Sequence, residues 1–246
     1  MKSGDIYRLG SHRLAYGSSS DTDLLARLVS ADKVAMVLTD PPYGVSYVES
    51  KRGIASLATD KVIANDNIGD ETEYKAFSVA WIEAVKPHLA RKNSIYIFNS
   101  DKMLVPTVEA MKSTGCKFAQ LLIWAKTHAV VGRLDYLPQH ELILYGWYGT
   151  HTFKKSKDKS ILVYPRPNRS KLHPTMKPVG LLRRLLLNSS SVRDIVFDGF
   201  AGSGSTLLAC EQTNRQCLAV ELDPEYCQVI IDRWERLTGQ TAELLI

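Results

Sequence analysis

The sequence contains few cysteines and no long hydrophobic run. None of its four cysteines lies in a C-x-x-C pair; they are Cys116, Cys210, Cys217 and Cys227. A zinc site or a disulfide framework is therefore not expected, whereas reduced and mostly buried thiols are. No stretch of 18 apolar residues is present, which argues against a membrane span, and Met1 to Asp5 lack the apolar core of a signal peptide. We expect a cytoplasmic protein with no metal and no membrane partner.

The fraction of charged residues is ordinary, but the charges are distributed unevenly along the chain. The 246 residues are 45% hydrophobic and 23% charged, with a net charge of +5, and a chain of this length can bury one sizeable core. Residues 151–173 contain a single acid, Asp158, and seven basic residues, which are Lys154, Lys155, Lys157, Lys159, Arg166, Arg169 and Lys171. Such a segment suits a polyphosphate partner such as DNA. A solvated surface loop has the same composition.

Short apolar runs alternate with helical patterns along the chain. Expected strands cover 34–39, 94–98, 118–124, 141–145, 194–197 and 216–220, and expected helices cover 71–90, 101–114, 178–189 and 205–213, with a last helix opening at Pro224. This alternation predicts an α/β protein with a mostly parallel sheet and helices on both faces.

A glycine-rich turn lies between the strand at 194–197 and the helix at 205–213. It contains Asp198, Gly199, Phe200, Gly202 and Gly204, and leads into Ser205 and Thr206. Glycines at this place let a ligand approach the backbone and the free amides of the helix N-terminus. An acidic residue, Glu221, ends the next strand, where a carboxylate can bind ribose hydroxyls.

Three nucleotide-type ligands use turns of this kind. A phosphate-binding P-loop requires Gly-Lys-Ser/Thr, and no lysine follows Gly204. The dinucleotide fingerprint requires a third glycine, and Leu207 occupies that position. S-adenosylmethionine carries no phosphate and suits a turn without lysine, so this turn indicates an S-adenosylmethionine site.

A second turn, Asp40-Pro41-Pro42-Tyr43, ends the strand at 34–39. Prolines make such a turn rigid, so the Asp40 carboxylate and the Pro41 carbonyl become preorganised acceptors. They can hold the two N–H groups of an exocyclic base amine and direct its lone pair at a methyl sulfonium. Tyr43 can stack on a base extruded from a duplex. No covalent intermediate is required, and an ordinary Pro-Pro turn is the alternative.

Together the two turns resemble the motifs of the DNA amino-methyltransferases. The catalytic turn comes first, the basic segment second and the cofactor turn last, an order that resembles the β-group of adenine-N6 and cytosine-N4 enzymes, a circular permutation of the usual fold. Residues 122–126 and 139–144 are similar to stretches that precede the family's target-recognition region. Residues 173–178 are similar to its motif before the cofactor turn.

The resemblance implies the architecture. We expect one methyltransferase domain over residues 1–246, with a Rossmann-like seven-stranded mixed sheet and a small basic target-recognition insertion at 146–173. In the cofactor site it implies that Phe200 packs beside the cofactor, Glu221 holds the ribose, Leu222 and Asp40 line the site, and Thr175 and Lys177 lie near the methionine carboxylate.

The chain departs from the family at one place. The strand beside the one that ends at Glu221 is expected near residues 13–17, where the family usually carries Gly-Asp and this chain carries Gly17-Ser18. Ser18 or Asp21 is then the candidate contact to the cofactor's adenine ring.

The expected activity is methylation of N6 of adenine in double-stranded DNA on a flipped base. Cytosine-N4 enzymes of the family more often carry serine where this chain has Asp40. Cytosine-N4 methylation, RNA methylation and a non-catalytic DNA-binding regulator remain alternatives. Expected partners are double-stranded DNA, a second copy of the chain and a cognate restriction nuclease. The protein is expected to be bacterial or phage-encoded and to associate with the nucleoid.

Overall fold

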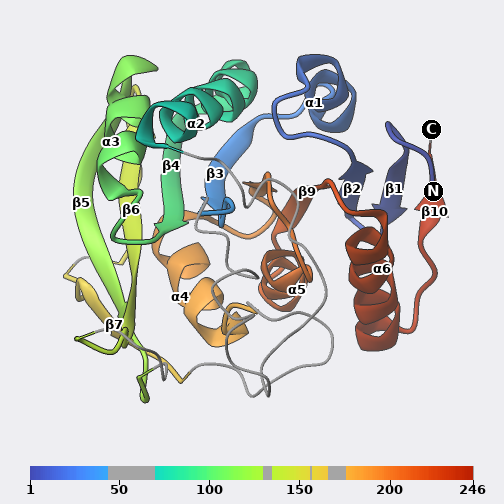
Figure 1. Ribbon diagram of the computed structural model, residues 1–246. Helices are drawn as coiled ribbons and strands as arrows, with labels where there is room; N and C mark the ends of the chain where they lie inside the picture. Colours follow the sequence, from blue (N-terminus) through green and yellow to red (C-terminus); the bar gives the residue numbers. More distant parts are fainter. Residues whose placement is uncertain (44–69, 130–134, 156, 166–175, 246) are drawn as a thin grey trace.

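The computed structural model describes residues 1–43, 70–129, 135–155, 157–165 and 176–245. Strands and helices alternate along most of the chain, as the sequence predicts (Figure 1). The strands are β1 (Ile6–Leu9), β2 (His12–Tyr16), β3 (Val34–Thr39), β4 (Leu89–Asn99), β5 (Cys116–Ala125), β6 (His140–Tyr148), β7 (Ile161–Val163), β8 (Ile195–Asp198), β9 (Gln216–Glu221) and β10 (Glu243–Leu244). The helices are α1 (Thr22–Val29), α2 (Glu71–Val85), the 3-10 helix η2 (Lys86–His88), α3 (Leu104–Ser113), α4 (Val179–Ser189), α5 (Ser205–Gln212) and α6 (Pro224–Thr238).

One mixed sheet holds all the strands of the described residues, in the order β10-β1-β2-β9-β8-β3-β4-β6-β5-β7. The expected seven strands are present as the run from β2 to β5, and β2, β9, β8, β3 and β4 in it are mutually parallel. The predicted count is wrong because three further strands extend the sheet: β1 and β10 on one side and β7 on the other. They have only two to four residues, too few to show an alternating pattern.

Alternation along the strands divides the core between the two faces of the sheet. Met36 and Leu38 of β3 belong to the core beneath α4, α5 and α6, whereas Val37 belongs to the core beneath α1, α2 and α3. Figure 1 shows these two groups of helices on opposite sides of the sheet. The strands are buried on both faces, as parallel strands usually are. All four cysteines are buried and free, as expected.

Two element ends differ from the sequence prediction. The helix expected over 71–90 ends at Val85, because Pro87 cannot donate the next helical hydrogen bond, and Leu89 begins β4 instead. Strand β6 continues to Tyr148, so the proposed insertion at 146–173 starts inside a strand and its β7 part joins the sheet. Helix α1 was not expected; Asp21 caps it by accepting from the amides of Asp23 and Leu24.

The parallel strands define two edges of the sheet with different properties. Strands β3, β8 and β9 end at Thr39, Asp198 and Glu221, and these carboxyl ends form what we call the carboxyl edge. Strand β6 begins at this edge, since Leu142 pairs with Asn99 at the end of β4. Open α/β sheets bind their ligands at this edge. No helix among the described residues is long and apolar enough to cross a membrane.

Candidate active site at the carboxyl edge

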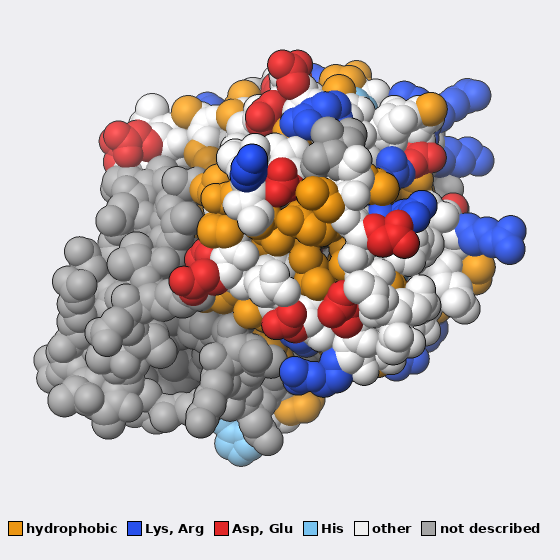
Figure 2. Space-filling model, turned by 90° about the vertical axis from the view of Figure 1, so that its right-hand side faces the viewer, with side chains coloured by type: hydrophobic (Ala, Val, Ile, Leu, Met, Phe, Trp, Pro, Cys, Tyr) orange, Lys and Arg blue, Asp and Glu red, His pale blue; other side chains and the backbone are white. Residues whose placement is uncertain are grey.

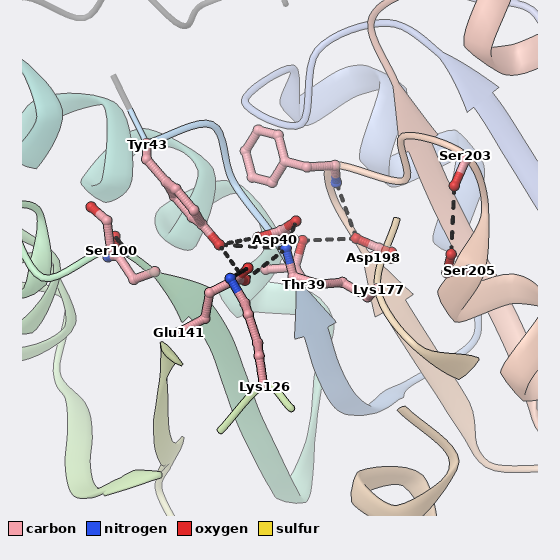
Figure 3. A network of polar contacts seen from close by, with 12 residues as sticks. Thr39, Asp40, Tyr43, Ser100, Lys126, Glu141, Lys177, Asp198, Ser203 and Ser205 are labelled. Atoms are coloured by element: carbon pink, nitrogen blue, oxygen red, sulfur yellow. Dashed lines mark hydrogen bonds and ion pairs between the residues drawn. The ribbon is translucent and has the colours of Figure 1, made fainter. Parts of the chain in front are cut away.

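One hydroxyl connects the two turns that the sequence singles out. The Thr39 hydroxyl at the end of β3 donates to Asp198 Oδ1 at 2.8 Å and accepts from the Gly199 amide at 3.1 Å. The Asp40-Pro41-Pro42-Tyr43 turn begins at the next residue, and Asp198 opens the glycine-rich turn. Strands β3 and β8 are hydrogen-bonded neighbours, so the two turns lie side by side although about 160 residues separate them in the sequence (Figure 3).

Asp40 receives hydrogen bonds on both of its carboxylate oxygens. The Tyr43 hydroxyl donates to Oδ1 at 2.6 Å, and the Lys177 ammonium pairs with Oδ2. Lys177 lies just before α4, in the segment 173–178 that resembles the motif preceding the family's cofactor turn. In this structure its ammonium therefore lies against the Asp40-Pro41-Pro42-Tyr43 turn. Its expected contact with the methionine carboxylate stays a prediction, and Thr175 lies outside the described residues.

Two residues that the sequence analysis did not place in the site extend this cluster. Glu141 accepts from Lys177 at 3.2 Å and from Lys126 at 2.9 Å, and the Tyr43 hydroxyl lies 3.4 Å from its Oε2 (Figure 3). Both lysine side chains are only 8% exposed, so the neighbouring carboxylates offset part of the cost of burying their charges. Asp40, Glu141, Lys126 and Lys177 thus form a balanced cluster of two acids and two bases, which we call the four-charge cluster.

Burial and pairing act against each other on the pKa values of this cluster. Burial raises the Asp40 pKa, and the charge of Lys177 only partly offsets it. Burial alone would lower the Lys177 pKa, but Asp40 and Glu141 outweigh it and hold that pKa above its usual value. Burial and the Asp40 charge raise the Tyr43 pKa well above its usual value, so the phenol remains a donor. Asp40 is accordingly a carboxylate with an enhanced tendency to accept a proton.

The glycine-rich turn has the backbone that its sequence requires. Gly202 has a φ of +52° and Gly204 a φ of +78°, both left-handed conformations that favour glycine. A Cβ at Gly204 would lie 3.0 Å from Ile230 of α6, so glycine also allows close packing there. Ser205 and Thr206 begin α5 directly after it. Phe200 packs its ring against Phe77 and Trp81 of α2, which fixes one wall of the turn.

Glu221 closes the other side of this turn. Its Oε2 accepts from the Gly202 amide at 2.6 Å, and its Oε1 accepts from the amides of Leu222 and Asp223 at 2.9 Å. Burial nevertheless raises the Glu221 pKa to about 7. Burial likewise raises the Asp198 pKa to about 6, against hydrogen bonds from Thr206 and Thr39. Asp223 accepts from the Glu225 amide and caps α6.

These residues fit S-adenosylmethionine. Glu221 presents a nearly buried carboxylate at the end of β9, and 40% of the neighbouring Leu222 remains exposed. The turn offers backbone amides and no lysine, which suits a ligand with a ribose and without phosphates. Asp21, one of the two candidates for an adenine contact, has its Oδ1 occupied by the cap of α1, and Ser18 accepts from the Ser20 amide.

The described residues of the basic segment do not lie together at the carboxyl edge. Strand β7 runs parallel to β5 and pairs Val163 with Ala125, so this described part approaches the carboxyl edge near Pro165. Lys154 lies at the opposite edge, where it lines a cavity with residues that precede β3 and β8. Between them, Asp158 accepts from Arg184 of α4 at 3.0 Å. The described lysines of the segment are exposed, and Arg166, Arg169 and Lys171 lie outside the described residues.

The sheet, the rigid acceptor turn and the adjoining glycine-rich turn define an S-adenosylmethionine-dependent methyltransferase. The family model of the N6/N4 DNA methylases matches residues 34–232. The chain belongs to this family and methylates DNA at specific sites, with S-adenosylmethionine as methyl donor.

Curated relatives match along most of their length. The Type II methyltransferase M.HpaI of Haemophilus parainfluenzae is 27% identical over 232 residues, which cover 82% of this chain and 68% of that protein. M2.DpnII of Streptococcus pneumoniae is 25% identical over 239 residues, 88% of each chain.

Solved structures share the fold. The M1.HpyAVI–SAM complex superposes with a TM-score of 0.66 at 22% identity, over 89% of this chain and 98% of that one. The TTHA0409 protein of Thermus thermophilus in complex with S-adenosyl-L-methionine gives 0.66 at 22% identity, over 94% and 96%. The cytosine-N4-specific PvuII DNA methyltransferase gives 0.66 at 16% identity, over 94% of both chains.

Removing the charge of Glu141 tests the four-charge cluster. The Glu141→Gln variant leaves Lys126 without its carboxylate and Lys177 with Asp40 alone. We expect the free energy of unfolding to fall by about 2–3 kcal/mol, since breaking a buried ion pair leaves an uncompensated charge. Urea denaturation of the purified variant measures this loss.

Glu109→Gln is the matched control for that measurement. It breaks an ion pair with Lys75 at 2.9 Å whose side chains are 53% and 40% exposed. Exposed pairs contribute about 0.2–1 kcal/mol. Equal losses in the two variants would mean that the cluster does not depend on Glu141.

Proposed function

We propose that this enzyme transfers the methyl group to N6 of adenine in double-stranded DNA, on a base flipped out of the duplex. The observation that carries the proposal is the Asp40 carboxylate at the end of β3, fixed by Tyr43 and Lys177 beside the cofactor turn. A carboxylate has about four lone-pair positions. Two of them are used within the protein, so Asp40 retains acceptors for an amine.

In the proposed reaction, Asp40 and the Pro41 carbonyl accept the two N–H groups of the exocyclic amine. Bound S-adenosylmethionine supplies an electrophilic methyl group on a sulfonium. The amine lone pair forms the new N–C bond as the C–S bond breaks, and the positive charge passes to the nitrogen. The excess proton then leaves to Asp40, whose raised pKa suits it as the acceptor.

Analysis of the labelled nucleoside tests the choice of base. The purified protein is incubated with methyl-labelled S-adenosylmethionine and unmethylated genomic DNA, which is then digested to nucleosides. We expect the label in N6-methyladenine. Label in N4-methylcytosine would keep the mechanism but overturn the assignment of adenine as the target base. The fold alone does not decide between the two bases, because the PvuII enzyme shares it and is cytosine-N4-specific. Label in neither nucleoside would favour RNA methylation or a non-catalytic role.

We also propose that the basic segment contacts DNA phosphates through the residues on its way to the carboxyl edge. Lys157→Gln combined with Lys159→Gln is expected to reduce the slope of log K against log salt by about 1.8, since each phosphate contact contributes about 0.9. Lys154→Gln should leave the slope unchanged, because Lys154 lies at the opposite edge. Fluorescence anisotropy of a labelled duplex at several salt concentrations measures the slope for both variants. An unaltered slope in the double variant would mean that Lys157 and Lys159 do not contact DNA phosphates.

The names of the relatives suggest a biological setting. M.HpaI and M2.DpnII are Type II methyltransferases. We propose that this enzyme likewise protects DNA against a restriction nuclease that recognises the same target sequence. We also propose that it works as a homodimer, because its basic segment is short and a second subunit would help it to read a target. Light scattering with and without a duplex tests the dimer.

A further inference from the structure

A second concave site lies at the edge of the sheet opposite the active site, which we call the amino edge. It is a cavity of about 460 Å³ between the starts of three parallel strands. Lys33 precedes β3, Lys92 lies near the start of β4, and Arg193 precedes β8. Lys154 of the basic segment completes the rim.

The four cationic residues of this lining come from four separate segments of the chain. Lys33, Lys92, Lys154 and Arg193 are all exposed, and no acid among the residues that the structure describes forms an ion pair with any of them. The single acid of the lining, Asp194, accepts from the Ser191 amide at 2.6 Å. In Figure 2, Lys and Arg side chains also project along the right-hand margin of the molecule. Four cations around one hollow repel one another, and an anion between them would relieve that repulsion.

The wall behind these cations is rigid and polar. Asn93 is buried, and its amide donates to the carbonyls of Ala90 and Tyr148 at 2.9 and 2.7 Å. The Ser189 hydroxyl lies 2.7 Å from the Tyr96 hydroxyl. Small side chains at Ala35 and Ala90 leave the space open. The hollow is therefore backed by hydrogen-bonded groups of the folded sheet.

Size and position select the kind of anion. Six residues of β3 separate Lys33 from Asp40, so the two lie seven residue steps apart, which corresponds to about 23 Å at 3.3 Å per residue. The cavity is thus remote from Asp40, where the target base binds in the proposed reaction. A cavity of about 460 Å³ falls in the range of small-molecule sites. Several cations around one small space suit linked phosphate groups better than a single one.

We propose that the amino-edge cavity binds a compact anion with linked phosphates, either inorganic polyphosphate or the phosphate chain of a nucleotide. Lys33, Lys92, Lys154 and Arg193 neutralise the phosphates, and the wall with Asn93 and Ser189 limits their size. The site is separate from the proposed methyl transfer, so each can fail without the other.

Calorimetric titration of the purified protein with tripolyphosphate tests this site. The titration contains about 50 mM salt, to limit screening, and saturating S-adenosylhomocysteine, to keep the cofactor site filled. We expect saturable one-to-one binding. The Lys92→Gln/Arg193→Gln variant should lose at least tenfold in affinity while its thermal unfolding stays as in the wild type.

The control is the Lys2→Gln/Arg236→Gln variant, which likewise removes one lysine and one arginine charge, but at exposed positions outside the cavity. It should change the affinity by less than about twofold. Equal losses in the two variants, or no saturable binding by the wild type, would overturn the proposal. A titration with ATP separates the two sources: ATP binding tighter than tripolyphosphate identifies a nucleotide, and equal or weaker binding identifies the phosphate chain alone.

Discussion

Replacing Asp40 with alanine is expected to lower kcat for methyl transfer by about 10³-fold or more. In the proposed reaction the variant lacks the acceptor for the target amine and the group that takes up its proton, and each such contribution accounts for about 10²–10⁴ in rate. Lys177 keeps Glu141 as a partner at 3.2 Å, so the fold should survive. Single-turnover transfer of labelled methyl groups to DNA measures the rate, with cofactor and DNA affinities measured in parallel.

Asp101→Ala is the matched control for this experiment. Asp101 is an exposed aspartate that follows β4 at the same edge of the sheet. Its removal should leave the rate within about twofold, because an exposed carboxylate interacts weakly with the site. Residual turnover of Asp40→Ala near the wild-type rate would remove Asp40 from the catalytic role, whereas parallel loss of cofactor and DNA binding would indicate a structural one.

Cofactor affinity is expected to increase as the pH rises from about 6 to 8. Burial raises the Glu221 pKa to about 7, so below that pH the side chain is increasingly a neutral acid. A carboxylate accepts the ribose hydroxyls more strongly than the neutral acid does. The affinity should therefore increase through pH 7 and level off once Glu221 is fully ionised. Titration with 5′-methylthioadenosine is a clean measurement, because that ligand has the ribose but no group that ionises in this range.

Glu221→Gln should remove this pH dependence. It keeps the shape of the side chain but not the charge, and hydrogen bonds to charged groups contribute about 1.5–3 kcal/mol. At pH 8 we expect about 10- to 100-fold weaker binding than in the wild type, with a flat profile from pH 6 to 8. Glu225→Gln in the first turn of α6 is the control and should keep the wild-type profile. A pH profile that survives in Glu221→Gln would assign the titration to another group.

The sequence predicts those parts of the site that are continuous in the chain. Asp40 to Tyr43 and Asp198 to Thr206 are short motifs at strand ends, and both occupy the carboxyl edge as expected. Their contact follows from general topology, because carboxyl ends of neighbouring parallel strands meet. Glu221 is placed beside the glycine-rich turn by the same reasoning, and the Gly202 hydrogen bond agrees with it.

Other parts depend on pairings that no local pattern reveals. Lys126 and Glu141 meet because β5 and β6 are antiparallel, with Trp124 opposite Glu141. The available signals were a charged residue at the same end of each apolar run and the resemblance of residues 122–126 and 139–144 to stretches of the family. The basic segment shows the opposite problem: its charges are adjacent in the sequence, yet the chain spans the height of the sheet and carries Lys154 away from Asp40.

The Thr39 hydroxyl, bonded to both Asp198 and the Gly199 amide, has an evolutionary consequence. It fixes the spacing between the Asp40 turn and the glycine-rich turn within two adjacent strands of the sheet. Segments outside these two strands can then change in sequence or length while the spacing between the turns is kept. New target sequences can thus evolve on this scaffold without reinventing the chemistry.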